Sequence, residues 1–240
     1  MKRLIIFVMT FVFGVITAQT QINKSFPATK NQNISLKFDY PQLIKISTWD
    51  KGEVQVSGTV NINDDENNDA FQIKESKEGN ALVIEGNVSG IDNLPHRITV
   101  HKGNEKLTFK TKEDYQQYCK TNGVTFNTMS NGVDINIELE IKVPKSLKTQ
   151  IEAKYGLVEV KNFGGEISVN AAYGGIDATI LEKNIGKLSA ETYYGQIYSN
   201  LDAKFAGKDS DDFHTLVTTT FGNGPQYSLE SKYGNIYLRK

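Results

Sequence analysis

The chain of 240 residues has a formal net charge of −1 at pH 7, from 27 basic and 28 acidic residues. Charges of both signs are interspersed, so the sequence lacks the basic surface that would predict a nucleic-acid partner. Cys119 is the only cysteine, which excludes an intramolecular disulfide, and the chain is long enough to bury a core without one. We expect Cys119 to be a partly buried, small apolar residue.

The first residues predict an export signal. Met1, Lys2 and Arg3 give a basic start, and an apolar run over residues 4–16 follows. This run is short for a membrane span, and Ala18 suits a cleavage position. We therefore predict a signal peptide over residues 1–18, with an uncleaved N-terminal anchor as the alternative. No membrane span is expected in the mature chain, which we place in the periplasm, at the outer membrane or outside the cell.

An N-terminal β region is predicted over residues 19–143. Apolar and polar residues alternate along several short segments, which is the pattern of half-buried strands. Turn residues separate the last two of these segments and predict a hairpin. The expected strands cover residues 34–40, 44–48, 54–56, 71–73 and 81–84.

One segment of this region breaks the strand pattern. Residues Thr111–Asn122 contain no alternation and suit a short helix that Gly123 ends, so we predict a helical insertion there. The longest regular alternation follows over residues 133–143, and it predicts a strand that Pro144 terminates.

A Tyr-Gly repeat marks the C-terminal region, residues 144–240. The four copies are separated by 18, 21 and 39 residues, and the last gap is about two periods. Residues at fixed offsets from each tyrosine keep their character: apolar four before it, small two before it, and Val or Ile three after it. The copies are Tyr155-Gly156, Tyr173-Gly174, Tyr194-Gly195 and Tyr233-Gly234.

This repeat predicts an all-β protein whose C-terminal part is a short parallel β-solenoid, with an antiparallel β-sandwich as the alternative. A period of about 20 residues is too short for a βαβ unit and suits stacked short strands joined at corners. We expect the four tyrosines to point inward as structural corner residues, and we expect Gly174 and Gly195 to adopt positive φ. The double-length gap, Ala203–Gly224, is predicted to hold one irregular coil with an acidic loop.

The sequence resembles a family of bacterial β-strand-repeat proteins, often labelled adhesin-like, which carry the domain of unknown function 4097 and are common among secreted Bacteroidetes proteins. Three features carry the resemblance: the segment Thr48–Val56, the segment Ile141–Lys145, and the Tyr-Gly-x-Ile/Val corners. The resemblance covers most of the mature chain and implies an architecture. It implies no reaction, because the family has no established catalytic residues. The insertion near Tyr115 and the loop near Asp211 depart from the simple repeat.

Possible binding residues are few. Tyr193, Tyr198 and Tyr237 have outward parity and are candidates for stacking on a sugar, although ordinary exposed aromatic residues share this pattern. The acidic run around Asp65 and Asp69 and the loop with Asp211 and Asp212 are weak calcium candidates, because both are dense in oxygen ligands but lack an EF-hand spacing. No cofactor, metal site or catalytic residue is predicted.

The leading functional hypothesis is a non-enzymatic, exported, adhesin-like protein that binds an envelope glycan or protein. A structural or sensory envelope component acting through protein contacts is the second hypothesis, and a carbohydrate-active enzyme on a β-helix is the third. The sequence contains no catalytic motif, and it leaves open the ligand, the oligomeric state and the role of the two insertions.

Overall fold

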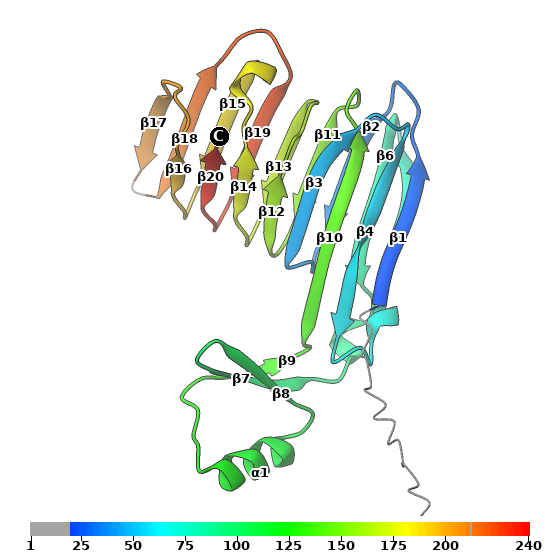
Figure 1. Cartoon of the computed structure of the whole chain (residues 1–240), viewed down its shortest axis with the longest axis vertical. Coiled ribbons are helices and arrows are strands. Elements are labelled where there is room, and N and C mark those ends of the chain that lie inside the picture. Colours follow the sequence, from blue (N-terminus) through cyan, green and yellow to red (C-terminus); the bar gives the residue numbers. More distant parts are fainter. Residues whose placement is uncertain (1–19, 212) are drawn as a thin grey trace, which may run out of the picture.

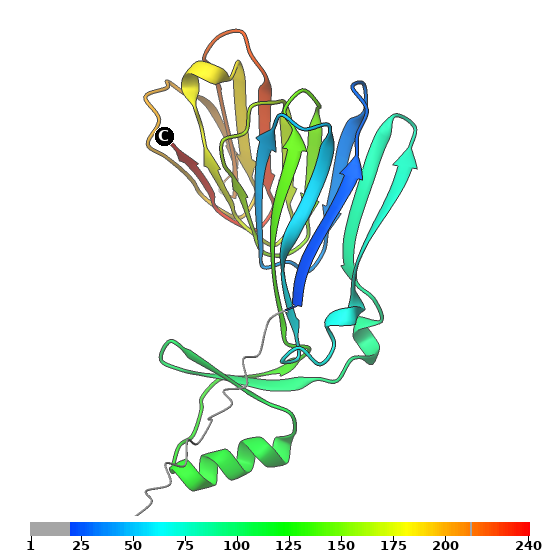
Figure 2. The ribbon, with the colours of Figure 1, turned by 45° about the vertical axis from the view of Figure 1, so that its right-hand side comes forward.

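The computed structural model describes residues 20–211 and 213–240. The predicted signal peptide, residues 1–18, lies outside this part. Within the described ranges the protein is mostly β-structure with a single α-helix, and no helix there has the length and apolar character needed to cross a bilayer. Two large sheets face one another as the layers of a body, and a small arm projects from one end of it (Figures 1 and 2).

Sheet I contains eight strands. Neighbouring strands in space are, in order, β1 (Thr20–Pro27), β4 (Glu53–Ile62), β10 (Ile135–Pro144), β3 (Leu43–Trp49), β12 (Leu157–Val160), β14 (Ile176–Thr179), β20 (Ile236–Arg239) and β16 (Ile197–Ser199). All pairs from β10 to β16 are parallel, whereas β1 pairs with β4 and β4 with β10 in the antiparallel direction.

Sheet II contains nine strands. Their spatial order is β17 (Ala206–Asp211), β18 (His214–Thr220), β15 (Lys187–Thr192), β19 (Gln226–Ser231), β13 (Ile167–Ala171), β11 (Thr149–Ala153), β2 (Asn33–Phe38), β6 (Ala81–Val88) and β5 (Phe71–Glu78). The central pairs from β15 to β6 are parallel, and antiparallel hairpins close both edges. The predicted hairpin is confirmed as β5–β6.

The chain passes repeatedly from sheet II to sheet I. We call one strand of sheet II, its bend and the next strand of sheet I a repeat unit; the units are β2/β3, β11/β12, β13/β14, β15/β16 and β19/β20. Parallel pairing puts the predicted columns in register, so Ile151 lies beside Val169, Val169 beside Leu229, and Leu229 beside Ala190. All four are buried between the sheets, which confirms the predicted apolar column.

The structure differs from a solenoid in the arrangement of these units. Both sheets are mixed, and the units are not stacked in chain order, because β19/β20 lies between β13/β14 and β15/β16. The free edge of β15 is taken by β18, which arrives in the antiparallel direction. The segment Ala203–Gly224 therefore holds the hairpin β17–β18 rather than the predicted irregular coil. The antiparallel sandwich also fails as a description, because the central strand pairs are parallel.

The core fills the space between the sheets with alternating residues of both. Ile34, Leu36 and Phe38 of β2 face Ile44 and Ile46 of β3 in one continuous cluster of buried side chains. Burial of such side chains supplies the main favourable term in folding, since each removes apolar surface from water. Strands of both predicted regions, 19–143 and 144–240, contribute to each sheet.

The arm contains the predicted helical insertion. Its three strands, in spatial order, are β8 (Glu105–Phe109), β7 (Arg97–Lys102) and β9 (Met129–Gly132), and its helix is α1 (Lys112–Asn122). Thr111 and Asp114 form a reciprocal capping box at the start of α1, and Gly123 ends the helix at φ 62°. The helix buries no residue, so it is held to the arm by half-buried aromatic rings such as Phe109 and Tyr118, 5.2 Å apart.

A turn between β4 and β5 attaches the arm to the body. Asn63 is fully buried at φ 53°, and its amide nitrogen donates to the carbonyl of Pro95 at 2.9 Å while its amide oxygen accepts from the backbone of Asp134 at 3.0 Å. Glu66 of the same turn binds Arg97 and Lys110. Lys110, and less strongly Arg97, hold the pKa of Glu66 below its usual range.

Candidate functional site

The bends between sheet II and sheet I gather the repeated tyrosines into one row. These bends all lie along the lower edge of the body in Figure 1, where the sheet I strands of the units begin. We call the rings along this edge the corner row. In spatial order they are Tyr40, Tyr155, Tyr173, Tyr233, Tyr194 and Phe213, with centroid separations of 5.9, 5.4, 5.1, 5.0 and 5.9 Å.

Backbone hydrogen bonds continue through the bends and fix the spacing of the corner row. The amide of Tyr173 donates to the carbonyl of Lys154 at 2.8 Å, and the amide of Tyr194 donates to the carbonyl of Lys232 at 3.0 Å. Tyr173 and Tyr233 consequently stack with an interplanar angle of 2°. Offset stacking at this separation is a favourable geometry for aromatic rings.

The corner tyrosines are exposed, so the prediction that they point inward was wrong. Tyr155, Tyr173, Tyr194 and Tyr233 keep between 41% and 58% of their surface accessible. Strand alternation does not apply to them, because the sheet II strands end two residues earlier, at Ala153 in the first case, and the chain then bends. The small residues of the neighbouring column line the buried side of the bend instead.

The glycines of the corners are required by close backbone packing. Gly174 and Gly195 do not have positive φ, contrary to the prediction, and among the corner glycines only Gly156 does, at 80°. A Cβ atom at Gly174 would lie 1.5 Å from the carbonyl oxygen of Gly156, and one at Gly195 would lie 2.0 Å from that of Gly234. Stacked bends therefore leave no space for a side chain.

Two hydroxyl groups complete the corners. Ser231 donates from its hydroxyl to the carbonyl of Gly174 at 2.8 Å and accepts from the amide of Gly234 at 2.9 Å. Thr192 donates in the same way to the carbonyl of Gly234 at 2.9 Å. Both side chains are fully buried. At these two positions the small column therefore ties adjacent bends together.

The stacking decides which atoms the corner row offers to a partner. Inner rings cover one another's faces, so their exposed parts are ring edges and phenol oxygens. Lys154 lies 5.5 Å from the centre of Tyr155, and Lys232 lies 5.4 Å from that of Tyr233, which adds two cations to the strip. Phe213 at the end of the row is 68% exposed. The row is a continuous surface with an apolar body and polar tips.

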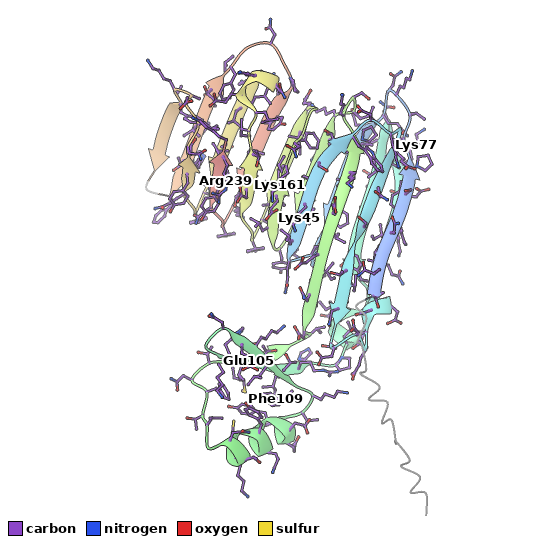
Figure 3. All side chains as sticks on the ribbon, in the orientation of Figure 1. Lys45, Lys77, Glu105, Phe109, Lys161 and Arg239 are labelled. Carbon is purple, nitrogen blue, oxygen red and sulfur yellow. The ribbon has the colours of Figure 1, made fainter. Side chains whose placement is uncertain are left out.

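Tyr198 and Tyr237, two of the predicted binding residues, lie together on the outer face of sheet I. Their rings stack at 5.2 Å, and Arg239 lies 5.2 Å from the centre of the Tyr237 ring while binding Asp177. Asp177 in turn raises the pKa of Arg239. Tyr198 belongs to the edge strand β16, so no further strand of sheet I covers its second side. Figure 3 shows Lys45, Lys161 and Arg239 along this face.

Tyr193, the third predicted binding residue, lies away from this pair. Its ring stacks on that of His214 at 4.7 Å, at the start of β18, and the His214 Nε2 atom is 2.7 Å from the Glu191 carboxylate. Glu191, and then Glu230, raise the pKa of Tyr193. A role of Tyr193, Tyr198 and Tyr237 in binding stays a prediction.

The weak calcium candidates do not form a cluster of metal ligands in the described part of the chain. Asp65 accepts a hydrogen bond from the amide of Asn68 at 2.7 Å, and Asp69 is exposed in a short 3-10 turn. The side chain of Asp211 and all of residue 212, hence Asp212, lie outside the described residues. Within residues 20–211 and 213–240, no three His, Cys, Asp or Glu side chains converge to hold an ion.

Carboxylates on the outer faces of the sheets have cationic partners close by. Glu159 binds Lys161 at 2.7 Å and raises its pKa, and Asp177 binds Arg239 at 2.7 Å. These carboxylates occupy neighbouring strands, β12 and β14, in register. Such pairs on an open sheet face are the usual way to solvate surface charge. Cys119, the single thiol, is half-buried on α1, as expected.

Comparisons with known proteins give a distant resemblance in fold. The chain matches no protein-family model and none of the curated proteins compared with it. A solved structure from Clostridium sporogenes, described as a "putative cell adhesion protein", is 15% identical, with a TM-score of 0.49, over 92% of this chain and 99% of the other. A "putative adhesin" from Bacteroides fragilis is 11% identical, with a TM-score of 0.25, over 94% and 100%. The resemblance to the family with the domain of unknown function 4097 stays a prediction.

Proposed function

We propose that the chain is a non-enzymatic, adhesin-like protein of the cell envelope that binds its partner through the corner row. The observation that carries this proposal is the continuous strip of exposed, stacked aromatic rings from Tyr155 to Phe213. Soluble monomers rarely expose contiguous apolar surface of this kind unless it contacts a partner. Aromatic residues are also enriched where protein surfaces bind.

The backbone makes the corner row suitable for repeated contact with one extended partner. Parallel pairing of the units fixes each ring at nearly the same spacing, so little conformational entropy is lost when a partner covers the strip. Phenol hydroxyls and the ammonium groups of Lys154 and Lys232 supply polar contacts along the row. The partner is an envelope glycan or protein that lies along the edge of the body.

The test measures retention of envelope components by the purified mature chain. Polysaccharide and protein fractions of the envelope are passed over immobilised protein, and the amount retained is compared with that on Tyr173→Ser and Tyr233→Ser variants. Each variant removes one central ring and is expected to lower affinity at least about tenfold, as for interface hot spots. Leu181→Ser is the matched control, because Leu181 is 44% exposed and lies outside the corner row.

The outcomes separate the hypotheses. Retention that falls in both tyrosine variants and persists in the control supports binding through the corner row. Retention of protein alone favours a structural or sensory component acting through protein contacts. If no fraction is retained, or if the variants retain as much as the wild type, the proposed function is wrong. Tyr173→Phe keeps the ring and shows whether the hydroxyl contributes.

A further inference from the structure

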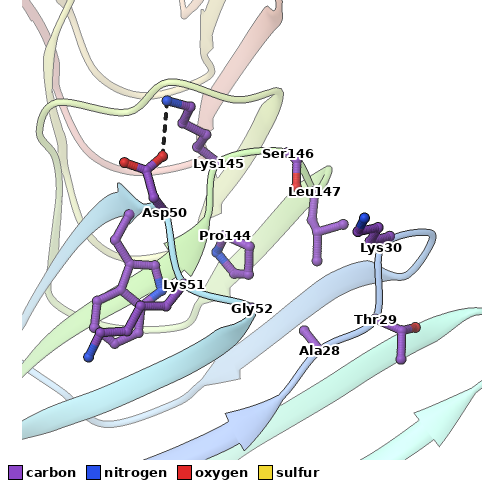
Figure 4. Close-up of a pocket in the computed structure, with 11 residues that line it drawn as sticks. Ala28, Thr29, Lys30, Asp50, Lys51, Gly52, Pro144, Lys145, Ser146 and Leu147 are labelled. Carbon is purple, nitrogen blue, oxygen red and sulfur yellow. Dashed lines mark ion pairs between the residues drawn. The ribbon is translucent and has the colours of Figure 1, made fainter.

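A second site lies at the other end of the strands, away from the corner row. Three turns meet there around a cavity of about 340 Å³. The turns are Ala28–Lys30 after β1, Trp49–Gly52 between β3 and β4, and Pro144–Leu147 between β10 and β11 (Figure 4). The two segments that carry the family resemblance, 48–56 and 141–145, are far apart in sequence but both reach this cavity.

Strand pairing positions the three turns, so the cavity exists before any ligand binds. β10 and β3 run in parallel and end together at Pro144 and Trp49, and the amide of Lys145 then donates to the carbonyl of Trp49 at 3.1 Å. On the other side, the amide of Ala28 donates to the carbonyl of Gly52 at 2.9 Å. A preformed site loses less entropy on binding than a mobile one.

The lining combines three kinds of group. Pro144 and Leu147 are buried and form apolar walls, and Figure 4 shows them between the Asp50–Gly52 turn and Lys30. Ser146 and Thr29 supply hydroxyl groups. Four charged residues complete the lining: Lys30, Lys51, Lys145 and Asp50.

The cavity carries a positive excess. Three lysines against one aspartate give a formal charge of +2. Asp50 binds Lys145 at 3.0 Å, so one ammonium group is already neutralised. The Nζ atom of Lys51 lies 4.6 Å from the centre of the Trp49 ring in a cation–π contact, on the opposite side of the cavity from Lys30 (Figure 4). Trp49 is fixed by donating from its ring nitrogen to the carbonyl of Glu53 at 2.8 Å.

The geometry points to a binding site for an acidic sugar residue, a hexuronic acid at the end of an envelope glycan. The volume is at the lower end for ligand pockets and suits one sugar ring. A carboxylate pairs with the ammonium group of Lys30, ring hydroxyls pair with Thr29 and Ser146, and the C–H faces cover the apolar walls. A bare inorganic anion leaves those walls uncovered, and a neutral sugar leaves the Lys30 ammonium group unpaired. The site is independent of the corner row.

The chain contains a single tryptophan, so its fluorescence reports on this site alone. The full-length mature protein is titrated with glucuronate, with glucose as the neutral control and inorganic phosphate as the anion control. Glucuronate is expected to change the Trp49 emission saturably with a Kd of about 1 mM, the range for a ligand of this size. Glucose is expected to have no effect, and added salt is expected to weaken glucuronate binding.

Two variants and a second measurement decide the assignment. Lys30→Ala is expected to weaken glucuronate binding about tenfold, measured by calorimetry as well as fluorescence, whereas Lys77→Ala, on an exposed edge strand, leaves it unchanged. Absence of binding by both methods would overturn the proposal. So would equal affinity for glucose, phosphate binding as tight as that of glucuronate, or full binding by Lys30→Ala. If the corner-row variants retain as much envelope material as the wild type, the proposed function fails, but these outcomes are unaffected.

Discussion

Replacing Gly174 by alanine tests whether the corners are limited by backbone contact. The added Cβ atom would lie 1.5 Å from the carbonyl oxygen of Gly156, which is half of the 3.0 Å below which real Cβ contacts are essentially absent. The bend cannot simply move away, because the amide of Tyr173 binds Lys154 and the amide of Val158 binds the carbonyl of Gly175 at 3.0 Å. Two adjacent repeat units must separate to accommodate one methyl group.

The expected cost of this overpacking is about 3 kcal/mol, the upper end for small-to-large changes in packed regions. For a chain of this length, that corresponds to a fall in Tm of about 6–12 °C. Thermal unfolding followed by circular dichroism measures the shift, and urea unfolding measures the free energy directly. The result assigns the corner glycines to close packing or to a special backbone conformation.

Two control glycines separate these explanations. Gly222 has open space around it and no positive φ, so Gly222→Ala is expected to change stability by less than about 0.5 kcal/mol. Gly79 also has open space but a φ of 58°, so Gly79→Ala is expected to cost about 1 kcal/mol from backbone strain alone. If the Gly174→Ala variant is as stable as the Gly222→Ala or the Gly79→Ala variant, the close-packing account is refuted.

Three further changes probe other parts of the chain. Tyr227 is buried and donates its hydroxyl to the carbonyl of Phe163, and burial raises its pKa from 10 to about 12. Its stabilising effect is therefore complete below pH 10 and is lost as pH rises through 12, by roughly 3 kcal/mol in all. Urea unfolding across this range should show the extra decline in the wild type and not in Tyr227→Phe; equal slopes would contradict it. Asn63→Ala removes a buried side chain that makes three hydrogen bonds, so we expect a loss of about 3 kcal/mol and faster hydrogen exchange in the arm, and unchanged exchange would argue against this anchor. Thr111→Ala removes half of the capping box and should lower the stability of α1 by about 1 kcal/mol, seen as faster exchange in that helix alone; exchange as slow as in the wild type would contradict a stabilising cap.

The repeat units could be predicted because parallel strands that pair in register place equivalent residues side by side on the same face of the sheet. Residues at equal offsets from each Tyr-Gly pair, such as Ile151 and Val169, do lie side by side. The same rule failed for the tyrosines, because alternation holds only while the backbone stays in a strand. Each tyrosine follows the end of its strand, and the bend turns the ring outward.

The spatial order of the units could not be read from the sequence. Every unit presents a similar apolar column to its neighbours. In the structure Val169 lies beside Leu229, but by residue type alone Ala190 would have fitted beside Val169 equally well. The cavity beside Trp49 was also missed, because its lining comes from three turns that are distant in sequence. A signal was present in Trp49, Lys51 and Lys145, which all follow strands that were predicted to end there.

The unit β19/β20 lies between two units that precede it in the chain. Residues 226–239 lie in the interior of both sheets, so removing them would open a gap between β13/β14 and β15/β16 rather than trim an edge. The edges of β13 and β15 can be joined only after β19 has been made. The unit β15/β16 and the hairpin β17–β18 therefore leave the ribosome before the strands that connect them to the rest of the two sheets.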